Sequence, residues 1–146
     1  MSLQAALASL QNAPDAHSKM GDWLTVTQDM INLFADASLD QQWIHQDTPF
    51  TREHSPYGTP VAHGFLTLSL IPHLLGDTGG KVTTFKGVKM GLNYGMNRVR
   101  FPSAVPVGAK IRAKSSVQSF KEVPNKGLEI ESLVHVEIEK VEKPAC

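Results

Sequence analysis

One apolar segment, residues 64–75, constrains the fold of this chain more than any other feature. Gly64 opens the segment, and the side chains that follow are apolar on nearly every side of a helix. A helix with this pattern is buried, because a surface helix needs a polar face. The segment therefore predicts a buried helix over residues 64–75, kinked where Pro72 lacks a backbone donor.

An antiparallel hairpin is predicted in the last third of the chain. Residues 109–120 alternate apolar side chains with Lys and Arg, and residues 128–139 alternate apolar side chains with Glu. Residues 124–127 read Pro-Asn-Lys-Gly, which is typical of a tight turn. The alternation predicts two strands with one apolar face and one charged face, the charges being of opposite sign on the two strands.

The first half of the chain predicts short helices and a loop. Residues 3–11 have alanines and leucines at helical spacing. Thr27 is a helix cap for residues 28–37, and Asp29 lies in the first turn. Residues 46–62 contain three prolines and a glycine, which indicates a loop. The apolar face of the second helix is made of Met30, Ile31, Leu33 and Phe34, and short strands are expected at residues 22–27, 88–94 and 98–101.

The order of these elements indicates fold class α+β in a single domain, residues 1–146. Helices come first and antiparallel strands later, with one buried helix available to fill the sheet. A chain of 146 residues is long enough for one sizeable core.

Composition bounds the partners and the location. The chain has 14 basic and 14 acidic residues, so we expect neither nucleic acid nor an anionic membrane as its main partner. The lone Cys146 cannot form an internal disulfide, which favours a reducing compartment. The N-terminus does not resemble a signal peptide, and no stretch reaches the roughly 20 apolar residues of a transmembrane helix. We therefore expect a cytoplasmic protein.

Asp40 and His45 are the first candidate catalytic residues. They lie five positions apart in a stretch that is too polar for a core strand, ahead of the apolar helix. A carboxylate and an imidazole on one loop can hold a water between a base and an acid, because a dry pocket moves their pKa values towards neutrality. The alternative is structural: Asp40 caps a helical turn and His45 is a partly buried loop residue.

His63 and Gly64 form the second candidate element. A glycine lets a ligand approach the backbone, and a free N–H group at a helix start can stabilise a developing negative oxygen. The alternative is a tight junction between loop and helix, in which His63 only hydrogen-bonds the loop. Asn93 and Tyr94 either line a pocket from the sheet or pack as ordinary strand residues.

A metal site is the weaker interpretation of the same region. His45, Asp47, His54 and His63 are residues of metal-ligand type, but their spacing matches no metal-binding motif. We therefore expect no metal. Basic side chains in the second half either pair with the phosphates of a nucleotide carrier or form solvated strand faces. These are Lys86, Lys89, Arg98, Arg100, Arg112 and Lys114.

Together the motifs resemble a known family. Asp40-x-x-x-Ile-His45-x-Asp47 is followed by Pro-Val-Ala-His-Gly64, the apolar helix, and then Arg-Val-Arg-Phe-Pro-Ser-Ala-Val-Pro-Val-Gly108. This combination resembles the MaoC-like dehydratases, also called (R)-specific enoyl-CoA hydratases, over residues 22–122. Gln-Trp-Ile-His and Asn93-Tyr94-Gly are similar to the NodN-like subgroup.

The resemblance implies a hot-dog fold, in which a curved antiparallel sheet wraps around the helix at residues 64–75. It implies a homodimer that adds water to a trans-2-enoyl thioester of coenzyme A or acyl carrier protein, giving the (R)-3-hydroxyacyl thioester. Asp40 and His45 would activate the water and handle the proton, and the N–H of Gly64 would polarise the thioester carbonyl.

Further residues are expected around this site, and two other functions remain open. Gln42, His63, Asn93 and Tyr94 are the expected substrate-binding residues. Gln42 and Trp43 depart from the family pattern, which has asparagine and proline there. A hot-dog thioesterase would direct the water to the carbonyl, and a non-catalytic acyl-thioester-binding protein would not turn the substrate over.

Overall fold

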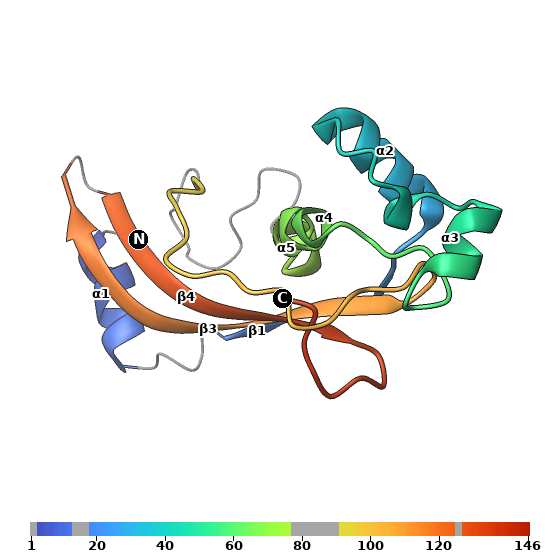
Figure 1. The fold of residues 1–146 in the computed structure, drawn as a ribbon. Helices are drawn as coiled ribbons and strands as arrows, with labels where there is room; N and C mark the ends of the chain where they lie inside the picture. Colours follow the sequence, from blue (N-terminus) through green and yellow to red (C-terminus); the bar gives the residue numbers. More distant parts are fainter. Residues whose placement is uncertain (1–2, 13–17, 77–90, 125–126) are drawn as a thin grey trace.

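A long, curved antiparallel hairpin dominates the fold (Figure 1). The computed structural model describes residues 3–12, 18–76, 91–124 and 127–146. Strand β3, Lys110–Val123, pairs with β4, Gly127–Ile138, and the register is irregular between Val117 and Ser119. The predicted hairpin is confirmed, and residues 125–126 of its expected turn lie outside the described residues.

The other edge of β3 carries two short strands that act as one interrupted strand. Strand β1, Lys19–Met20, pairs with the middle of β3, and β2, Leu24–Thr25, pairs with its start. Between them the N–H of Gly21 donates to the carbonyl of Ala113 at 2.9 Å. The strand expected at residues 22–27 is therefore present in a shorter form.

The end of the chain extends the sheet beyond β4. The N–H of Ala145 donates to the carbonyl of Val136 at 2.7 Å, and the N–H of Val136 donates to the carbonyl of Cys146 at 2.8 Å. Ala145 is only 2% exposed, so this segment closes one side of the core.

Two consecutive helices lie across the inner face of the hairpin (Figure 1). They are α4, Gly64–Ser69, and α5, Ile71–Leu74. The break falls at Leu70, and Pro72 lies in the first turn of α5. Because proline has no N–H, it cannot donate to the carbonyl four residues before it, and the predicted kink is confirmed.

The core lies between these helices and the sheet. Leu66 and Leu74 of the helices pack with sheet residues and with the ends of nearby loops. The buried cluster comprises Val26, Ile31, Ala62, Leu66, Leu74, Val105, Ile111, Ala113, Val136, Ile138 and Ala145. The helix is buried on one side only, since Phe65 is 66% exposed; the expectation of a helix buried all round is wrong for this residue.

Helices α1, Leu3–Asn12, and α2, Gln28–Ser38, match their predicted positions. The N-cap of α2 is Thr27, whose Oγ1 accepts a hydrogen bond from the N–H of Met30 at 3.3 Å. Ile31 is buried, but Leu33 is 71% exposed, so its assignment to the apolar face is wrong. Leu33 lies on the side of the helix that faces away from the core.

The predicted loop at residues 46–62 contains a helix that the sequence analysis missed. Helix α3, Pro49–His54, follows the short 3₁₀ turn η2, Trp43–His45. Thr48 is the N-cap, accepting from the N–H of Thr51 at 3.1 Å, and Pro49 lies in the first turn. Proline is compatible with the first turn of a helix because the N–H it lacks would be unpaired there anyway.

The strands expected at residues 88–94 and 98–101 are a second difference. Residues 91–101 form no strand, and residues 88–90 lie outside the described part. Side chains in this stretch are largely exposed, including Leu92, Tyr94 and Met96. Over the described ranges, no helix is long and apolar enough to cross a bilayer.

Gly21 sets the distance between the sheet and the end of α5, and its substitution tests this contact. A Cβ at Gly21 would lie 1.5 Å from the carbonyl oxygen of Leu74, so Gly21→Ala has to displace backbone. We expect it to lower the free energy of unfolding by about 2 kcal/mol or more in urea titrations. Gly95→Ala is the matched control, because a Cβ there meets nothing within 4 Å. A loss below about 0.5 kcal/mol for Gly21→Ala would show that the contact is not tight.

Candidate active site

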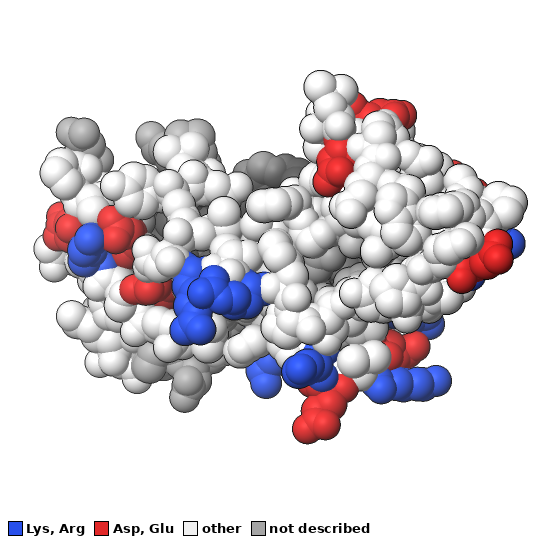
Figure 2. All heavy atoms as spheres, viewed as in Figure 1, with Lys and Arg blue, Asp and Glu red and all other residues white. Residues whose placement is uncertain are grey.

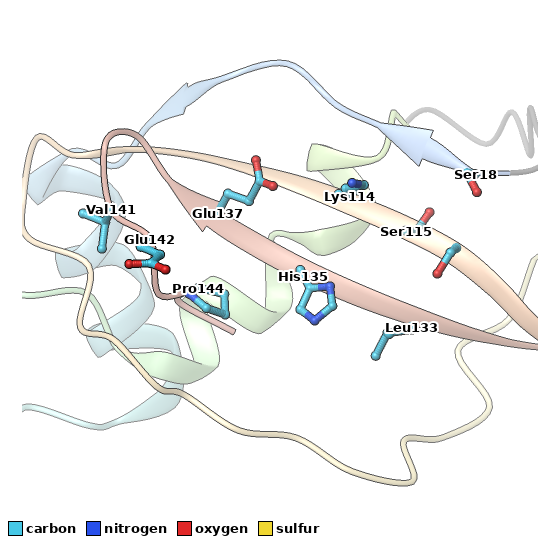
Figure 3. Close-up of a pocket in the computed structure, with 10 residues that line it drawn as sticks. Ser18, Lys114, Ser115, Leu133, His135, Glu137, Val141, Glu142 and Pro144 are labelled. Carbon is cyan, nitrogen blue, oxygen red and sulfur yellow. The ribbon is translucent and has the colours of Figure 1, made fainter. Parts of the chain in front are cut away.

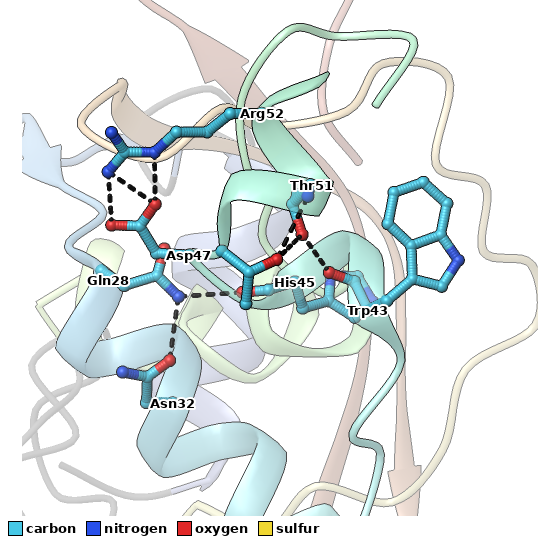
Figure 4. Close-up of polar contacts among 8 residues, drawn as sticks. Gln28, Asn32, Trp43, His45, Asp47, Thr51 and Arg52 are labelled. Atoms are coloured by element: carbon cyan, nitrogen blue, oxygen red, sulfur yellow. Dashed lines mark hydrogen bonds and ion pairs between the residues drawn. The ribbon is translucent and has the colours of Figure 1, made fainter. Parts of the chain in front are cut away.

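The loop that joins α2 to α3 is held from both helices (Figure 4). Gln28 of α2 donates through Nε2 to the backbone carbonyl of His45 at 2.8 Å. Thr51 of α3 donates through Oγ1 to the carbonyl of Trp43, also at 2.8 Å. The periodicity of apolar residues in a sequence does not reveal such contacts, so no role was predicted for Gln28 or Thr51. Together they fix the turn that carries His45.

His45 is held as a defined tautomer. Its side chain is 9% exposed, and its Nδ1 lies 2.7 Å from the carbonyl oxygen of Val61. A carbonyl only accepts, so Nδ1 carries the hydrogen, and the neutral ring keeps a lone pair on Nε2. Burial is the largest influence on the pKa of His45 and lowers it below 6.5. The positive charge of a protonated His63 also lowers this pKa, whereas the bond to Val61 and the charge of Asp40 raise it. Neutral His45 is thus the favoured form near pH 7.

His63 forms its hydrogen bond through the other ring nitrogen, Nε2. It is 2% exposed, and its Nε2 lies 3.0 Å from the backbone carbonyl oxygen of Asp40. The same reasoning places the hydrogen of His63 on Nε2. Its Nδ1 is buried and has no hydrogen-bond partner among the described groups.

The two imidazoles lie against each other. Their ring centroids are 3.6 Å apart, with 26° between the ring planes. The ring of Phe34 in α2 also contacts His63, with 5.1 Å between the ring centroids. One carboxylate oxygen of Asp40 and one ring nitrogen of each histidine all lie within 4.8 Å of one another. The structure therefore brings together Asp40, His45 and His63, which we call the Asp–His–His cluster.

Among the described residues, the Asp–His–His cluster is the group whose side chains lie close enough together to ligate a metal ion. A zinc ion needs lone pairs that converge at about 2.0–2.1 Å, and each lone pair lies in the plane of its own ring. Stacked rings direct these lone pairs side by side, so the cluster fits a hydrogen-bonded water better than an ion. Asp47 instead pairs with Arg52 at 2.8 Å, and His54 stacks on Phe50 at 4.2 Å.

Gly64 begins α4 immediately after His63. The first helical bond recorded here runs from the N–H of Thr67 to the carbonyl of His63, and no acceptor for the N–H of Gly64 is recorded among the described residues. A Cβ at Gly64 would lie 2.9 Å from Cγ of Phe101, which explains why glycine fits here. Gly64 and Phe101 both line a cavity of about 220 Å³. The sequence analysis quoted Phe101 within a motif but gave it no role.

Some expected site residues lie elsewhere. Gln42 is exposed, and its N–H donates to Oδ1 of Asp40 at 3.4 Å, so the structural role of Asp40 as a cap of the turn is also present. Asn93 and Tyr94 are exposed, Tyr94 by 87%, and neither lines the cavity at Gly64. In the described structure their segment is not part of the sheet, and it does not bring these two residues to the cavity at Gly64.

Among the basic side chains considered for carrier phosphates, Arg112 forms an ion pair. Arg112 pairs with Glu137 at 2.7 Å and lies 4.4 Å over the ring of Trp23. This supports the solvated-face interpretation for Arg112. Arg98 and Arg100 are exposed, and Figure 2 shows basic side chains gathered over the segment that contains them. Lys86 and Lys89 lie outside the described residues.

A second hollow lies away from the Asp–His–His cluster (Figure 3). Its volume is about 450 Å³, and its lining includes Lys114, His135, Glu137 and Glu142. Lys114 and His135 are opposite each other on β3 and β4 and are exposed, whereas their neighbours Ala113 and Val136 face the core. This hollow is therefore on the outer face of the sheet, so size alone does not identify the reactive site.

Comparison with known proteins gives the family. A family described as "MaoC like domain" matches residues 9–140. The chain is 44% identical to 3-hydroxyacyl-thioester dehydratase Z of Mycobacterium tuberculosis over 97% of this chain and 90% of that protein. It is 41% identical to nodulation protein N of Rhizobium meliloti, over 84% and 74% of the two chains.

A solved structure supports the fold. The (R)-hydratase from A. caviae, described as involved in PHA biosynthesis, superposes with a TM-score of 0.60 at 21% identity, covering 83% of this chain and 82% of that one. This likeness confirms the hot-dog arrangement of curved antiparallel sheet and central helix, in class α+β. The NodN-like resemblance is matched by the nodulation protein. The chain therefore belongs to the MaoC-like domain family, the dehydratase family that its motifs resemble.

Proposed function

We propose that this protein is a hydro-lyase that interconverts trans-2-enoyl thioesters and (R)-3-hydroxyacyl thioesters by syn addition or removal of water. The observation that carries the proposal is the approach of the Asp40 carboxylate to within 4.8 Å of a ring nitrogen of His45, whose tautomer leaves Nε2 open. The name of the mycobacterial relative, a 3-hydroxyacyl-thioester dehydratase, supports the reaction. The description of the A. caviae protein as an (R)-hydratase supports the stereochemistry.

Two hydrogen-bond acceptors define what the site does to a water. The Asp40 carboxylate and Nε2 of His45 each accept one hydrogen from the same water, which leaves its oxygen lone pair directed at C3 of the enoyl group. As the C3–O bond forms, Nε2 of His45 takes one proton from the water, and the same proton is then delivered to C2 on the same face, which returns His45 to its neutral form. The addition is therefore syn, and the reverse sequence removes water.

The N–H of Gly64 supplies the second function of the site. Negative charge moves onto the thioester oxygen as the C3–O bond forms, and a backbone donor at that oxygen stabilises it. The cavity of about 220 Å³ beside Gly64 gives the thioester end of the substrate a place to lie. Phe101 lines this cavity, and a substrate that displaces water from it would strengthen the hydrogen bond.

We also propose that the whole chain, residues 1–146, is one hot-dog domain that works as a homodimer on a thioester of coenzyme A or acyl carrier protein. Exposed apolar side chains support a second copy, since Phe65, Leu92 and Met96 are each at least 66% exposed. A reducing location, the cytoplasm, is consistent with the single Cys146, whose thiol pKa is raised by burial.

Turnover of crotonyl-CoA tests the proposed reaction. We expect the enoyl-thioester absorbance to fall with wild-type protein, and Asp40→Asn and His45→Ala to lower kcat by about 100-fold or more, because each removes one acceptor for the water. Asp22→Asn and His73→Ala are the matched controls, since both side chains are exposed and lie outside the cluster. Near-normal turnover in both site variants would exclude this mechanism. Release of free thiol would identify a thioesterase instead.

The pH dependence of kcat/KM tests the role of His45 as the base. Only neutral His45 accepts a proton, so activity falls as the pH drops through its pKa. Because burial lowers that pKa, we expect the acid limb to have its midpoint below 6.5. In an NMR titration, Asp40→Asn should lower the pKa of His45 further, because Asp40 raises it. A limb above 6.5 would contradict the proposed base.

The molecular mass in solution tests the homodimer. We expect sedimentation equilibrium to give twice 15.9 kDa, because pairing buries apolar side chains that are exposed on one copy. The same mass should persist on dilution to micromolar concentrations. A mass of one chain under these conditions would overturn the homodimer.

A further inference from the structure

We propose that His63 is a positioning residue: it holds the Asp40 main chain in place and, stacked on His45, favours the neutral form of that ring. The inference deepens the proposed function, on which it rests. His63 does not itself exchange a proton with the substrate in this assignment.

The first step is the geometry of Asp40. Three hydrogen bonds to this residue are recorded, and the bond from Nε2 of His63 to its carbonyl oxygen, at 3.0 Å, is the shortest. In the other two, both 3.4 Å long, the N–H of Asp40 donates to Oγ of Ser38 and the N–H of Gln42 donates to Oδ1 of Asp40. Asp40 is exposed. The bond from His63 therefore holds the Asp40 main chain, and the N–H of Gln42 meets its carboxylate.

The second step is the tautomer of His63. Its Nε2–H is committed to Asp40, and its Nδ1 is buried without a partner among the described groups. His63 therefore donates to Asp40 from Nε2 and leaves Nδ1 without a bond in the interior of the described structure.

The third step is the contact between the rings. His63 lies 3.6 Å from His45, between His45 and Phe34 of α2. Asp40 and the two imidazoles are the titratable groups that face one another here, because α2 contributes only the neutral Gln28 and Phe34 and the 60–62 segment contributes a carbonyl. A proton on either ring opposes a proton on the other, so His63 favours neutral His45.

Two substitutions separate these contributions. His63→Gln keeps an N–H donor near the position of Nε2 but removes the ring. His63→Phe keeps a ring but removes the donor. We expect His63→Phe to lower kcat by about 10- to 100-fold with KM changed by less than about threefold, because Asp40 loses its anchor. We expect His63→Gln to recover most of this loss.

The pH profile gives a readout that a purely structural role would not move. Because the His63 imidazole lowers the pKa of His45, its removal should raise that pKa and shift the acid limb of kcat/KM to higher pH in both variants. His73→Ala, an exposed histidine of α5, is the control and should shift nothing. If both His63 variants kept the wild-type kcat and acid limb and lost only thermal stability, His63 would be a structural core residue and the proposal would fail.

Imidazole ¹⁵N NMR tests the positioning role without any turnover. The wild-type protein should show His45 with its hydrogen on Nδ1 and His63 with its hydrogen on Nε2. In His63→Gln, His45 should keep its hydrogen on Nδ1, where the Val61 carbonyl accepts it, and should titrate at higher pH. An Nε2–H tautomer of His45 in wild type, or an unchanged titration in His63→Gln, would overturn the inference. This result stands even if no enoyl thioester is turned over, so it is distinguishable from failure of the proposed function.

Discussion

The hydrogen bond between Nδ1 of His45 and the carbonyl of Val61 is the contact on which the site depends. Val61 and Ala62 are part of the buried structure, and Ala62 donates to the carbonyl of Val105 at 2.8 Å. The core thus fixes the carbonyl, the carbonyl fixes the tautomer of His45, and the tautomer decides which nitrogen can accept a proton. The loop therefore presents one defined ring nitrogen of His45, Nε2, because Nδ1 is hydrogen-bonded to a carbonyl of the core.

The two proposed acceptors, Asp40 and His45, differ in burial. His45 is buried, which lowers its pKa and keeps it neutral, whereas Asp40 is exposed and keeps contact with water. In the proposed mechanism, a water held between them is bound by two acceptors and no donor. That arrangement leaves the oxygen lone pair free, which is the requirement for adding water to an electron-poor double bond.

Local patterns predicted much of the fold, because local physical chemistry determines those parts. Strand alternation gave the β3–β4 hairpin, Thr27 gave the start of α2, and Pro72 gave the break between α4 and α5. Leu33 and the 91–101 segment could not be placed in this way, since their burial depends on which distant element lies opposite. The same holds for the site: Asp40 and His45 were found by spacing, but the stack of His63 on His45 joins residues 18 positions apart.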